Sequence, residues 1–389
     1  MDKMKVAIVG LSFGLEFVPI YLSHPNVSQL IIVDQNPSMV KTAQSRYGIK
    51  EEDCYASLDD VLNDPSIDAV HLVTPPATHA PFSIRVLEAG KHCACTIPMG
   101  MSLEEIEQVI QARVKSGKNY MFMETTAYQR ETMYIKECVD KGEFGEIQYM
   151  SCAHYQDMEG WPDYWKGYPP LMHPTHALAP CLLIAGDTPA SVYAVGSGQI
   201  REELTKQYHC SFAFESAFVK LKQKNIVIEL ERFLYGVARG YSECFRIYGS
   251  QKSFEWQQLD GENPALFVRT QEQEDYGMGR DSYVRGTKIA GSRIEIPDFA
   301  DRLPEQLACY TKKTAYTSEI THLSFVQGGG HGGSHPHIIH EFVSSILEDR
   351  EPKPSDIDGA YWTATGICAH ESAMSGGKEI AIPDYSIYR

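Results

Sequence analysis

The chain has 389 residues, with 35 basic and 51 acidic side chains and a formal net charge of −16. This acidic balance argues against nucleic-acid binding, which depends on clustered Lys and Arg. No segment approaches the roughly 18 consecutive apolar residues of a membrane span, and the N-terminus has no signal-peptide pattern. The 10 cysteines form no CxxC pair, which indicates reduced thiols. We therefore expect a cytoplasmic protein with no membrane association.

The first 125 residues alternate short β-rich runs with longer segments of helical periodicity. This alternation predicts a doubly wound α/β domain over residues 1–125, with a parallel sheet wrapped by crossover helices. Some boundaries carry clear signals, such as Ser102 with Glu105 as a capping box and Gly117 as a helix stop. The expected strands are 5–9, 30–33, 69–73, 92–96 and 120–123, and the expected helices are 16–22, 37–47, 58–62, 80–89 and 103–116.

Residues 126–389 have a different pattern and are predicted to form a second, α+β domain. A helix over 131–141 is followed by many short alternating runs, which favour a large open, mainly antiparallel sheet. Its expected strands are 147–155, 190–196, 212–221, 226–233 and 243–248. Residues 261–304 are polar and aperiodic, and we expect long loops or a lid there. Helices are predicted over 337–348 and 360–375, and the second of these is expected to pack back on the first domain.

The first predicted strand runs directly into a glycine turn, and the second ends in an acidic residue. A glycine turn at a helix start can hold a pyrophosphate, and the acid can bind the adenosine ribose hydroxyls. The match to G-x-G-x-x-G is partial, so an ordinary strand-to-helix turn remains the alternative. The position of Asp34 favours a nicotinamide dinucleotide, and its charge favours NAD over NADP. The expected cofactor-binding residues here are Gly10, Ser12, Phe13, Gly14, Leu15, Asp34 and Gln35.

A second turn follows the strand predicted over 69–73. Ligands in open α/β sheets bind beyond the carboxyl ends of the strands, so this turn should line the cofactor crevice. A plain proline turn would explain its two prolines equally well. The residues expected to contact the cofactor are Thr74, Pro75, Pro76 and His79.

These motifs resemble those of the Gfo/Idh/MocA oxidoreductases over nearly the whole chain. Besides the glycine turn, Asp34 and the 74–79 turn, the resemblance rests on AGKH at 89–92, KGEFGE at 141–146 and Pro383-Asp384. It implies an N-terminal Rossmann domain with tightly held NAD and a C-terminal domain with an open sheet. It also implies a sugar or polyol substrate and a homo-oligomer, a dimer or tetramer, formed through the open sheet face.

Two departures from the family pattern are informative. The family's Glu-Lys-Pro, with its catalytic lysine, is replaced by Thr96, Ile97 and Pro98, which we still expect to contact the cofactor. Met172 stands where the usual Asp precedes the catalytic His by four residues. Both departures point to a specialised branch that resembles the NAD-dependent redox glycosidases of the α-N-acetylgalactosaminidase type. The matching segments are HPTHALAP at 173–180, METTAYQR at 123–130 and GHGG at 330–333, with His173 in place of the branch's Tyr.

The resemblance and the residue types together suggest roles in catalysis. Oxidation of a ring hydroxyl needs a proton acceptor near neutral pH, and His176 is the first candidate, assisted by His173 or Tyr128. A ketone at C3 would acidify the hydrogen at C2, and Glu124 is the candidate base. Alternatively, Glu124 binds a cofactor ribose hydroxyl. His331, in its glycine-rich loop, is expected to lie over the sugar, although a flexible hinge is the alternative.

Aromatic side chains precede the 173–180 segment and either stack on a sugar or pack a loop. The expected substrate-binding residues are Trp161, Trp165, Tyr155 and His331. A competing metal site is conceivable because His331, His335, His337, His340 and Glu341 lie close together in the sequence. Their spacing matches no standard zinc signature, so we expect no metal.

The sequence thus predicts an NAD-dependent oxidoreductase that transfers hydride to and from a carbohydrate ring, at C3 of a glycoside. The first alternative is a redox-neutral NAD-dependent glycoside hydrolase, which would combine oxidation, elimination, water addition and reduction. The second is a non-catalytic sugar or dinucleotide sensor.

Overall fold

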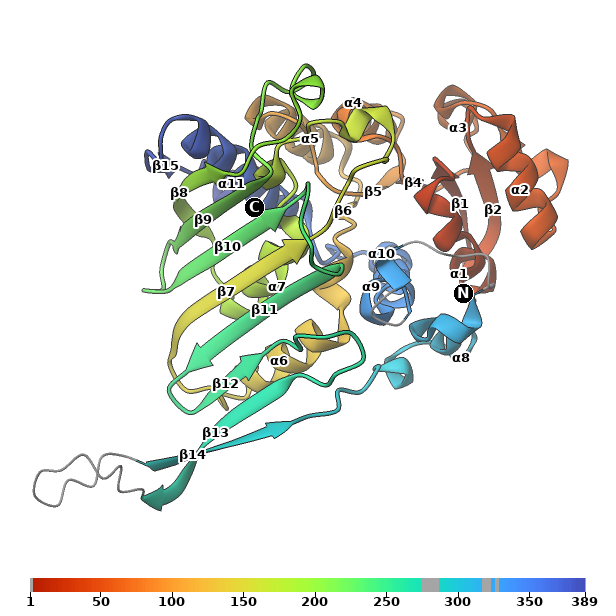
Figure 1. Cartoon of the computed structure of the whole chain (residues 1–389). Helices are drawn as coiled ribbons and strands as arrows, with labels where there is room; N and C mark the ends of the chain where they lie inside the picture. The colour runs from red at the N-terminus through yellow and green to blue at the C-terminus, as the bar shows by residue number, and fades with distance from the viewer. Residues whose placement is uncertain (1–2, 274–286, 317–322, 326–328, 389) are drawn as a thin grey trace, which may run out of the picture.

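The computed structural model describes residues 3–273, 287–316, 323–325 and 329–388. Their strands form two sheets (Figure 1). The first is six-stranded and parallel, in the order β3-β2-β1-β4-β5-β6, which is the strand order of a Rossmann domain. Its strands are β1 Met4–Val9, β2 Val27–Val33, β3 Cys54–Tyr55, β4 Ala69–Leu72, β5 His92–Cys95 and β6 Tyr120–Phe122. Its helices are α1 Val18–Ser23, α2 Pro37–Tyr47, α3 Leu58–Asn63, α4 His79–Glu88 and α5 Leu103–Ser116.

The second sheet is nine-stranded, in the order β14-β13-β12-β11-β7-β10-β9-β8-β15. The pair β7 and β10 is parallel and the other pairs are antiparallel. The strands are β7 Ile147–Tyr155, β8 Pro189–Ser197, β9 Phe214–Leu221, β10 Val227–Phe233, β11 Ser242–Gly249, β12 Lys252–Glu255, β13 Ala265–Gln273, β14 Thr287–Arg293 and β15 Ile380–Ala381. The remaining helices are α6 Arg130–Asp140, α7 Thr175–Ala185, α8 Glu305–Ala308, α9 Gly330–Gly333, α10 His335–Leu347 and α11 Asp356–Met374. The predicted α/β fold class is confirmed.

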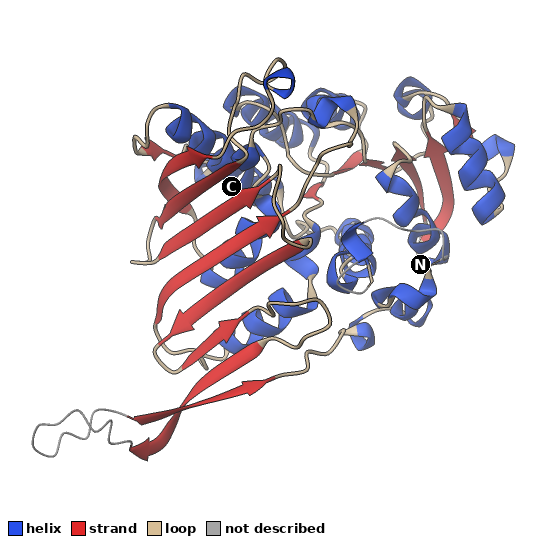
Figure 2. Ribbon diagram, in the orientation of Figure 1, coloured by secondary structure: helices blue, strands red, loops and turns tan. Residues whose placement is uncertain are grey.

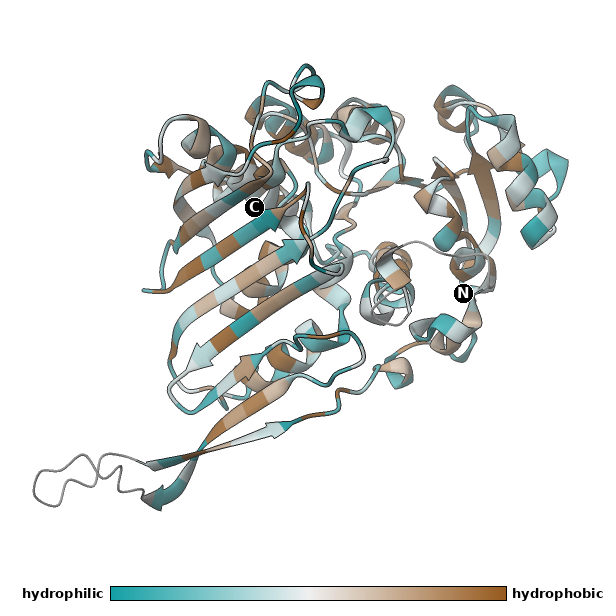
Figure 3. Cartoon of the chain, in the orientation of Figure 1, coloured by the Kyte–Doolittle hydropathy of each residue, from teal (hydrophilic) through white to brown (hydrophobic). Residues whose placement is uncertain are grey.

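Helices cover one face of the large sheet (Figure 2). Helices α6, α7 and α11 lie on the far side of the sheet in Figure 1. The face turned to the viewer carries no helix of the described residues. In Figure 3 the strands of this sheet alternate in colour, while β2 of the parallel sheet is mostly brown. Alternation is typical of a sheet with one buried face, and continuous apolar runs are typical of strands buried on both faces. None of the helices in the described ranges is long and apolar enough to cross a membrane.

Helix α11 joins the two sheets. It packs on β8 of the large sheet and on α5 and β6 of the parallel sheet. Gly359 permits this approach, because a Cβ there would lie 2.6 Å from Cγ of Phe122. A bidentate ion pair, with Arg113 Nε and Nη2 at 2.7 and 3.0 Å from the Asp356 carboxylate, ties α5 to the start of α11. The helix predicted over 360–375 is therefore present, begins earlier, and contacts the first sheet.

The structure differs from the sequence prediction in several elements. The helix expected over 16–22 is split into a 3-10 turn Phe13–Glu16 and helix α1, because Pro19 fits only the first turn of a new helix. The loops or lid expected over 261–304 are wrong over β13 and β14, which pair there as outer strands of the large sheet, and residues 274–286 of this range lie outside the described residues. Helix α7 was not predicted, since its internal Pro180 normally ends a helix.

Candidate active site

A cavity of about 610 Å³ lies where the carboxyl ends of β1, β4, β5 and β6 meet residues of the second sheet and of α7. It brings together many residues that the sequence singled out. The predicted site residues that line it are Ser12, Phe13, Leu15, Thr74, Pro76, His79, Thr96, Ile97, Trp161, Trp165, His173, His176 and His331. The position of the cavity at the carboxyl ends of a Rossmann sheet is where such folds bind a dinucleotide.

The glycine turn after β1 is held in place from two sides. Gly10 has φ +94°, and a Cβ there would lie 2.3 Å from the carbonyl oxygen of Val73, so the turn requires glycine. Leu11 N donates to Asp34 Oδ2 at 2.7 Å, which ties the turn to the end of β2. Asn36 N donates to the other oxygen of Asp34 at 2.8 Å. These contacts shape the start of the cavity as a narrow backbone cradle that suits a pyrophosphate.

His79 locks the next two turns together. Its ring nitrogens lie 2.7 Å from the carbonyl oxygens of Pro98 and Thr74, so the turns after β4 and β5 share one anchor. Ile97 contributes an apolar side chain to the wall at the place where the family's lysine would stand. The Ile97 side chain cannot polarise a carbonyl group.

His176 lies on the first turn of α7 and is held by a buried carboxylate. Its Nδ1 donates to Glu124 Oε1 at 2.7 Å. The same oxygen accepts hydrogen bonds from Thr126 N at 3.0 Å and Thr126 Oγ1 at 2.9 Å. Glu124 is fully buried behind His176, at the end of β6, and is not part of the cavity wall. Glu124 therefore contacts the cavity only through the imidazole.

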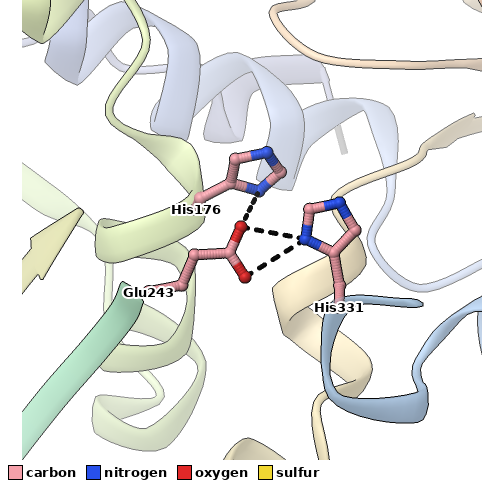
Figure 4. Close-up of side chains that lie close together, drawn as sticks. All are labelled: His176, Glu243 and His331. Carbon is pink, nitrogen blue, oxygen red and sulfur yellow. Dashed lines mark hydrogen bonds and ion pairs between the residues drawn. The ribbon is translucent and has the colours of Figure 1, made fainter. Parts of the chain in front are cut away.

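A second buried carboxylate, Glu243 at the start of β11, lies between His176 and His331 (Figure 4). His331 Nδ1 donates to its two oxygens at 2.9 and 3.1 Å. His176 Nδ1 lies 3.8 Å from Oε1. Gln129 Nε2 donates to Oε2 at 2.7 Å, and the Tyr241 hydroxyl donates to Oε1. Figure 4 shows that the other nitrogen of each ring points away from Glu243.

The carboxylates and His176 shift one another's pKa values. Burial alone would raise the pKa of Glu243, but His331 and His176 outweigh it and hold that pKa at about 2. At Glu124, burial would also raise the pKa, but His176 lowers it by more. Burial would lower the pKa of His176, yet the charges of Glu124 and Glu243 raise it above its ordinary value. The site thus keeps two ionised carboxylates beside an imidazole that readily takes a proton.

Two further imidazoles in the wall are held neutral. Burial and the nearby Arg232 guanidinium lower the pKa values of His154 and His173 well below the ordinary value. Within the described part of the chain, neither ring nitrogen of His154 has a hydrogen-bond partner. The rings of His154 and His176 meet edge to face at 5.3 Å between centroids. A buried imidazole with unused nitrogens in a cavity wall is suited to contact a polar ligand.

Other predicted site residues lie outside the cavity wall. The Tyr128 hydroxyl donates to the carbonyl oxygen of Lys353 at 2.7 Å. Tyr155 stacks on Phe233 with ring centroids 4.9 Å apart, on the uncovered face of the sheet, because its neighbour His154 faces the helices. The wall also does not include Gly10, Gly14, Asp34, Gln35, Pro75, Pro98 and Glu124.

Sequence reasoning missed a row of buried polar residues that crosses the large sheet. Glu243 of β11 pairs with His154 of β7, which pairs with Arg232 of β10. All of them lie on the helix-covered face, in the same alternation as the buried Phe245, Cys152 and Leu230 of these strands. A charged residue that continues the apolar face of a predicted strand was the signal that could have found Glu243 and Arg232.

The histidine cluster considered as a metal site is dispersed. His337 Nε2 lies 3.3 Å from the Asp298 carbonyl oxygen, and His340 Nδ1 lies 3.1 Å from His24 Nε2. Elsewhere, ligand atoms of His176, Glu243 and His331 lie within 4.8 Å of one another, as do those of Cys210, Glu215 and His370. In both groups a histidine nitrogen is at hydrogen-bond distance from a carboxylate, so we describe them as hydrogen-bonded pairs.

Comparisons with known proteins agree with this geometry. Residues 4–124 match the Gfo/Idh/MocA oxidoreductase family model for the NAD-binding Rossmann fold, and residues 136–382 match its model for the C-terminal α/β domain. A glycosyl hydrolase family 109 protein of Shewanella baltica is 32% identical, over 85% of this chain and 72% of its own length. An α-N-acetylgalactosaminidase of Shewanella oneidensis is 24% identical over the same shares.

A solved structure of levoglucosan dehydrogenase with NADH and L-sorbose has the same fold, with a TM-score of 0.76, 18% identity, and coverage of 99% of this chain and 100% of that one. The prediction of NAD as cofactor is confirmed by the family model. The chain belongs to the Gfo/Idh/MocA family of NAD-dependent oxidoreductases, in the branch that contains the glycosyl hydrolase family 109 proteins.

Proposed function

We propose that this enzyme transfers hydride to and from a carbohydrate ring, at C3 of a glycoside. The observation that carries the proposal is the position of His176. Its ring lines the cavity that begins at the glycine turn, and buried Glu124 holds its Nδ1 at 2.7 Å. NAD held at the glycine turn would supply the acceptor for the hydride from the oxidised carbon. A proton acceptor held beside that carbon is the complement that the protein must supply.

His176 takes the hydroxyl proton in this proposal. Because Nδ1 donates to Glu124, Nε2 carries the lone pair and is the atom that accepts the proton. The positive charge that forms on the ring is stabilised by Glu124 and, from 3.8 Å, by Glu243. Glu124 acts through His176 rather than on the substrate in this proposal, since its side chain is fully buried and does not line the cavity.

The second candidate function is the redox-neutral glycoside hydrolase. The observation that favours it is a second carboxylate-held imidazole in the same cavity, with the rings of His176 and His331 5.0 Å apart. A dehydrogenase needs one proton acceptor, whereas the hydrolase also needs a base for the hydrogen at C2. In this scheme His331 removes that proton, the C1 substituent leaves, water adds, and the hydride returns to C3. The glycosyl hydrolase relatives also support it.

The aromatic part of the wall is the proposed sugar platform. Trp161 and Trp165 line the cavity with their rings edge to face, 6.3 Å apart. Trp165 also meets the ring of His173, with centroids 5.2 Å apart, and His173 meets the ring of His176 at 5.3 Å. These contacts support a platform close to the proposed proton acceptor. The face of a sugar ring packs well on an indole, and neighbouring imidazoles can bind its hydroxyls.

The experiment combines two readouts on one sample. The enzyme is incubated with NAD and a panel of aryl glycosides while NADH absorbance and phenol release are followed together. Lasting NADH growth without phenol supports the dehydrogenase, and phenol release without net NADH supports the hydrolase. The His176→Ala variant is the control and should lose either signal. If the wild-type enzyme binds NAD but gives neither NADH nor phenol with any glycoside, both candidate functions are contradicted.

We also propose a cytoplasmic homo-oligomer formed through the uncovered face of the large sheet. Tyr193 and Val195 on β8 point to that face, with 37% and 57% of their surface exposed. Exposed apolar side chains on one sheet face are typical of an interface. Light scattering after size exclusion should show a dimer or tetramer, and Val195→Glu should shift it toward the monomer. A monomeric wild-type chain contradicts the proposal.

A further inference from the structure

Glu243 contacts both imidazoles of the site, and the proposed reaction uses only its charge beside His176. It lies at the start of β11 with its carboxylate fully buried on the helix-covered face. It accepts hydrogen bonds from His331, Gln129 and Tyr241, and lies 3.8 Å from Nδ1 of His176. These residues come from elements that are far apart in the sequence, so their meeting at one carboxylate is a property of the fold.

We propose that Glu243 is a positioning residue that couples His176 and His331 into one proton-transfer pair. One carboxylate faces the Nδ1 atoms of both imidazoles, and both rings line the cavity. The other nitrogen of each ring points away from Glu243 (Figure 4), and in this proposal both of these nitrogens face the substrate. The role rests on the proposed function, in which these imidazoles move protons at a carbohydrate ring.

The backbone at His331 supports this role. His331 has φ 42° and ψ 61°, a left-handed conformation that is strained for a residue with a Cβ. Such a conformation persists only where surrounding contacts hold it. The two-oxygen contact with Glu243, at 2.9 and 3.1 Å, is a hydrogen-bonded contact that helps to hold this side chain. The rings of Phe13, His176 and His335 also pack against it. In this strained backbone conformation the His331 imidazole lines the cavity.

The carboxylate is itself held rigidly, so it can set the direction of the His331 ring. Gln129 Nε2 donates to Oε2 at 2.7 Å from the turn before α6, and the Tyr241 hydroxyl donates to Oε1 from the residue before β11. A carboxylate with both oxygens engaged has little freedom to rotate. His331 therefore takes its orientation from Glu243. His176 takes its orientation from Glu124, and Glu243 acts on its Nδ1 through its charge at 3.8 Å.

The charges around His176 define what Glu243 adds. Glu124 is the nearer carboxylate, at 2.7 Å from Nδ1, and Glu243 is the more distant one, at 3.8 Å. The two carboxylates raise the pKa of His176, and the Arg232 guanidinium lowers it. The groups that face His176 from the surrounding elements are Glu124, Glu243, Arg232, His154, His173 and His331. Glu124 faces His176 alone, whereas Glu243 faces both imidazoles, and this difference can be tested.

A matched control lies in the same sheet. Glu215 of β9 is fully buried on the same face, and its register partner is Arg232. Its Oε1 accepts a hydrogen bond from His370 Nδ1 at 2.7 Å, outside the cavity. Glu215→Gln therefore removes a buried carboxylate from beneath an imidazole without touching the proposed pair.

The test uses full-length, NAD-loaded protein with ¹⁵N-labelled histidine, and follows the ring nitrogens by NMR as pH is changed. In Glu243→Gln the titration midpoint of His176 should fall by on the order of one pH unit, and the Nδ1 signal of His331 should move away from its carboxylate-bonded position. Glu124→Gln should lower the midpoint of His176 and leave His331 unchanged. Glu215→Gln should move only His370.

Other outcomes overturn the proposal. If Glu243→Gln moves neither histidine, or moves His331 alone, Glu243 does not couple the pair. If elemental analysis finds one divalent metal ion per chain, and a chelator changes the His176 and His331 signals, the cluster is a metal site instead. Where Glu243→Gln does not fold, Glu243→Asp keeps the charge on a shorter side chain. It should preserve the midpoint of His176 and change the His331 signal, and an unchanged His331 would contradict the proposal.

These readouts need no substrate, so their failure is distinct from a failure of the proposed function. Once a turned-over glycoside is known, the pH profile adds a further check. Glu243→Gln should move the acidic limb of the rate to lower pH, and Glu243→Asp should restore it. A purely structural role would lower the rate at all pH values without moving the limb.

Discussion

Arg232 donates a hydrogen bond from Nε to the main-chain carbonyl oxygen of His173 at 3.0 Å. Its other nitrogens donate to the carbonyl oxygens of His154 and Phe233 and to Gln156 Oε1. The guanidinium is fully buried, and this burial lowers the pKa of Arg232 to about 9. Strand β10 thereby holds the backbone just before α7, and the place of His176 in the cavity depends on that hold.

Arg232→Lys should weaken both the fold and the site. A lysine has one nitrogen and cannot replace a planar fork that serves several acceptors, so buried carbonyl groups lose their donors. The free energy of unfolding should fall by about 2–4 kcal/mol, and the proposed turnover should fall because His173 and α7 shift. Urea denaturation measures the first effect. Arg246→Lys, on the exposed side of β11, is the control and should change little.

His176→Ala should abolish the chemical step without loss of the cofactor. Removal of the proton acceptor should lower turnover of the glycoside by roughly 10²–10⁴-fold. NAD affinity, measured by fluorescence titration, should stay within a factor of about two, since the glycine turn and the 74–79 turn are untouched. His370→Ala removes another carboxylate-held imidazole outside the cavity and serves as the control. Turnover above a tenth of the wild-type value would contradict the role of His176.

The pH profile should report the imidazole at position 176. The charges of Glu124 and Glu243 raise the pKa of His176 against the effect of burial, so the neutral, proton-accepting form appears only above the ordinary value of about 6.5. The rate of glycoside oxidation should therefore rise with pH through that raised pKa. Glu124→Gln removes the nearer charge and should move this limb to lower pH. A limb that stays in place would assign the titration to another group.

Stability at acidic pH should depend on Glu243. Its pKa is about 2 in the folded chain, held down by His331 and His176 against burial, and its ordinary value is 4.5. A lowered carboxyl pKa gives stability that is fully present above the unfolded value and is lost as pH falls through the folded value. The difference in free energy of unfolding between wild type and Glu243→Asn should thus be largest above about pH 4.5. Denaturant titrations from pH 7 down to about 2 measure it, and a constant difference would contradict the assignment.

The parallel sheet could be predicted because its signals are local. Helix α5 was predicted to the residue, since Ser102 Oγ accepts from Glu105 N at 3.1 Å and Gly117 adopts a left-handed conformation at the end. The capping box is only half formed, because the Glu105 side chain accepts from Met101 N instead. Strands β13 and β14 were missed because their apolar residues are confined to short stretches, such as residues 265–268, and their strand character comes from pairing with each other and with β12.

The site was predictable where a motif carried it and not where register decides it. His176 and His331 stand in segments that resemble a known family, and both line the cavity. Glu243, His154 and Arg232 stand in no motif, and they meet only because β11, β7 and β10 are aligned at these residues. Register between strands that are far apart in sequence depends on tertiary packing, which a single sequence does not show. The partners of the two histidines therefore had to come from the structure.

Two glycine-to-alanine substitutions separate the effect of backbone strain from that of steric collision in the glycine turn. Gly48→Ala places a Cβ on a residue with φ +67° and no atom within 4 Å, so it should cost only the strain of about 1 kcal/mol. Gly10→Ala adds a contact of 2.3 Å with the Val73 carbonyl oxygen to a similar strain, and the turn must open to accept it. We expect NAD affinity to fall at least about tenfold for Gly10→Ala and to stay unchanged for Gly48→Ala. If Gly10→Ala binds NAD as tightly as the wild type, the turn after β1 is not where the pyrophosphate lies.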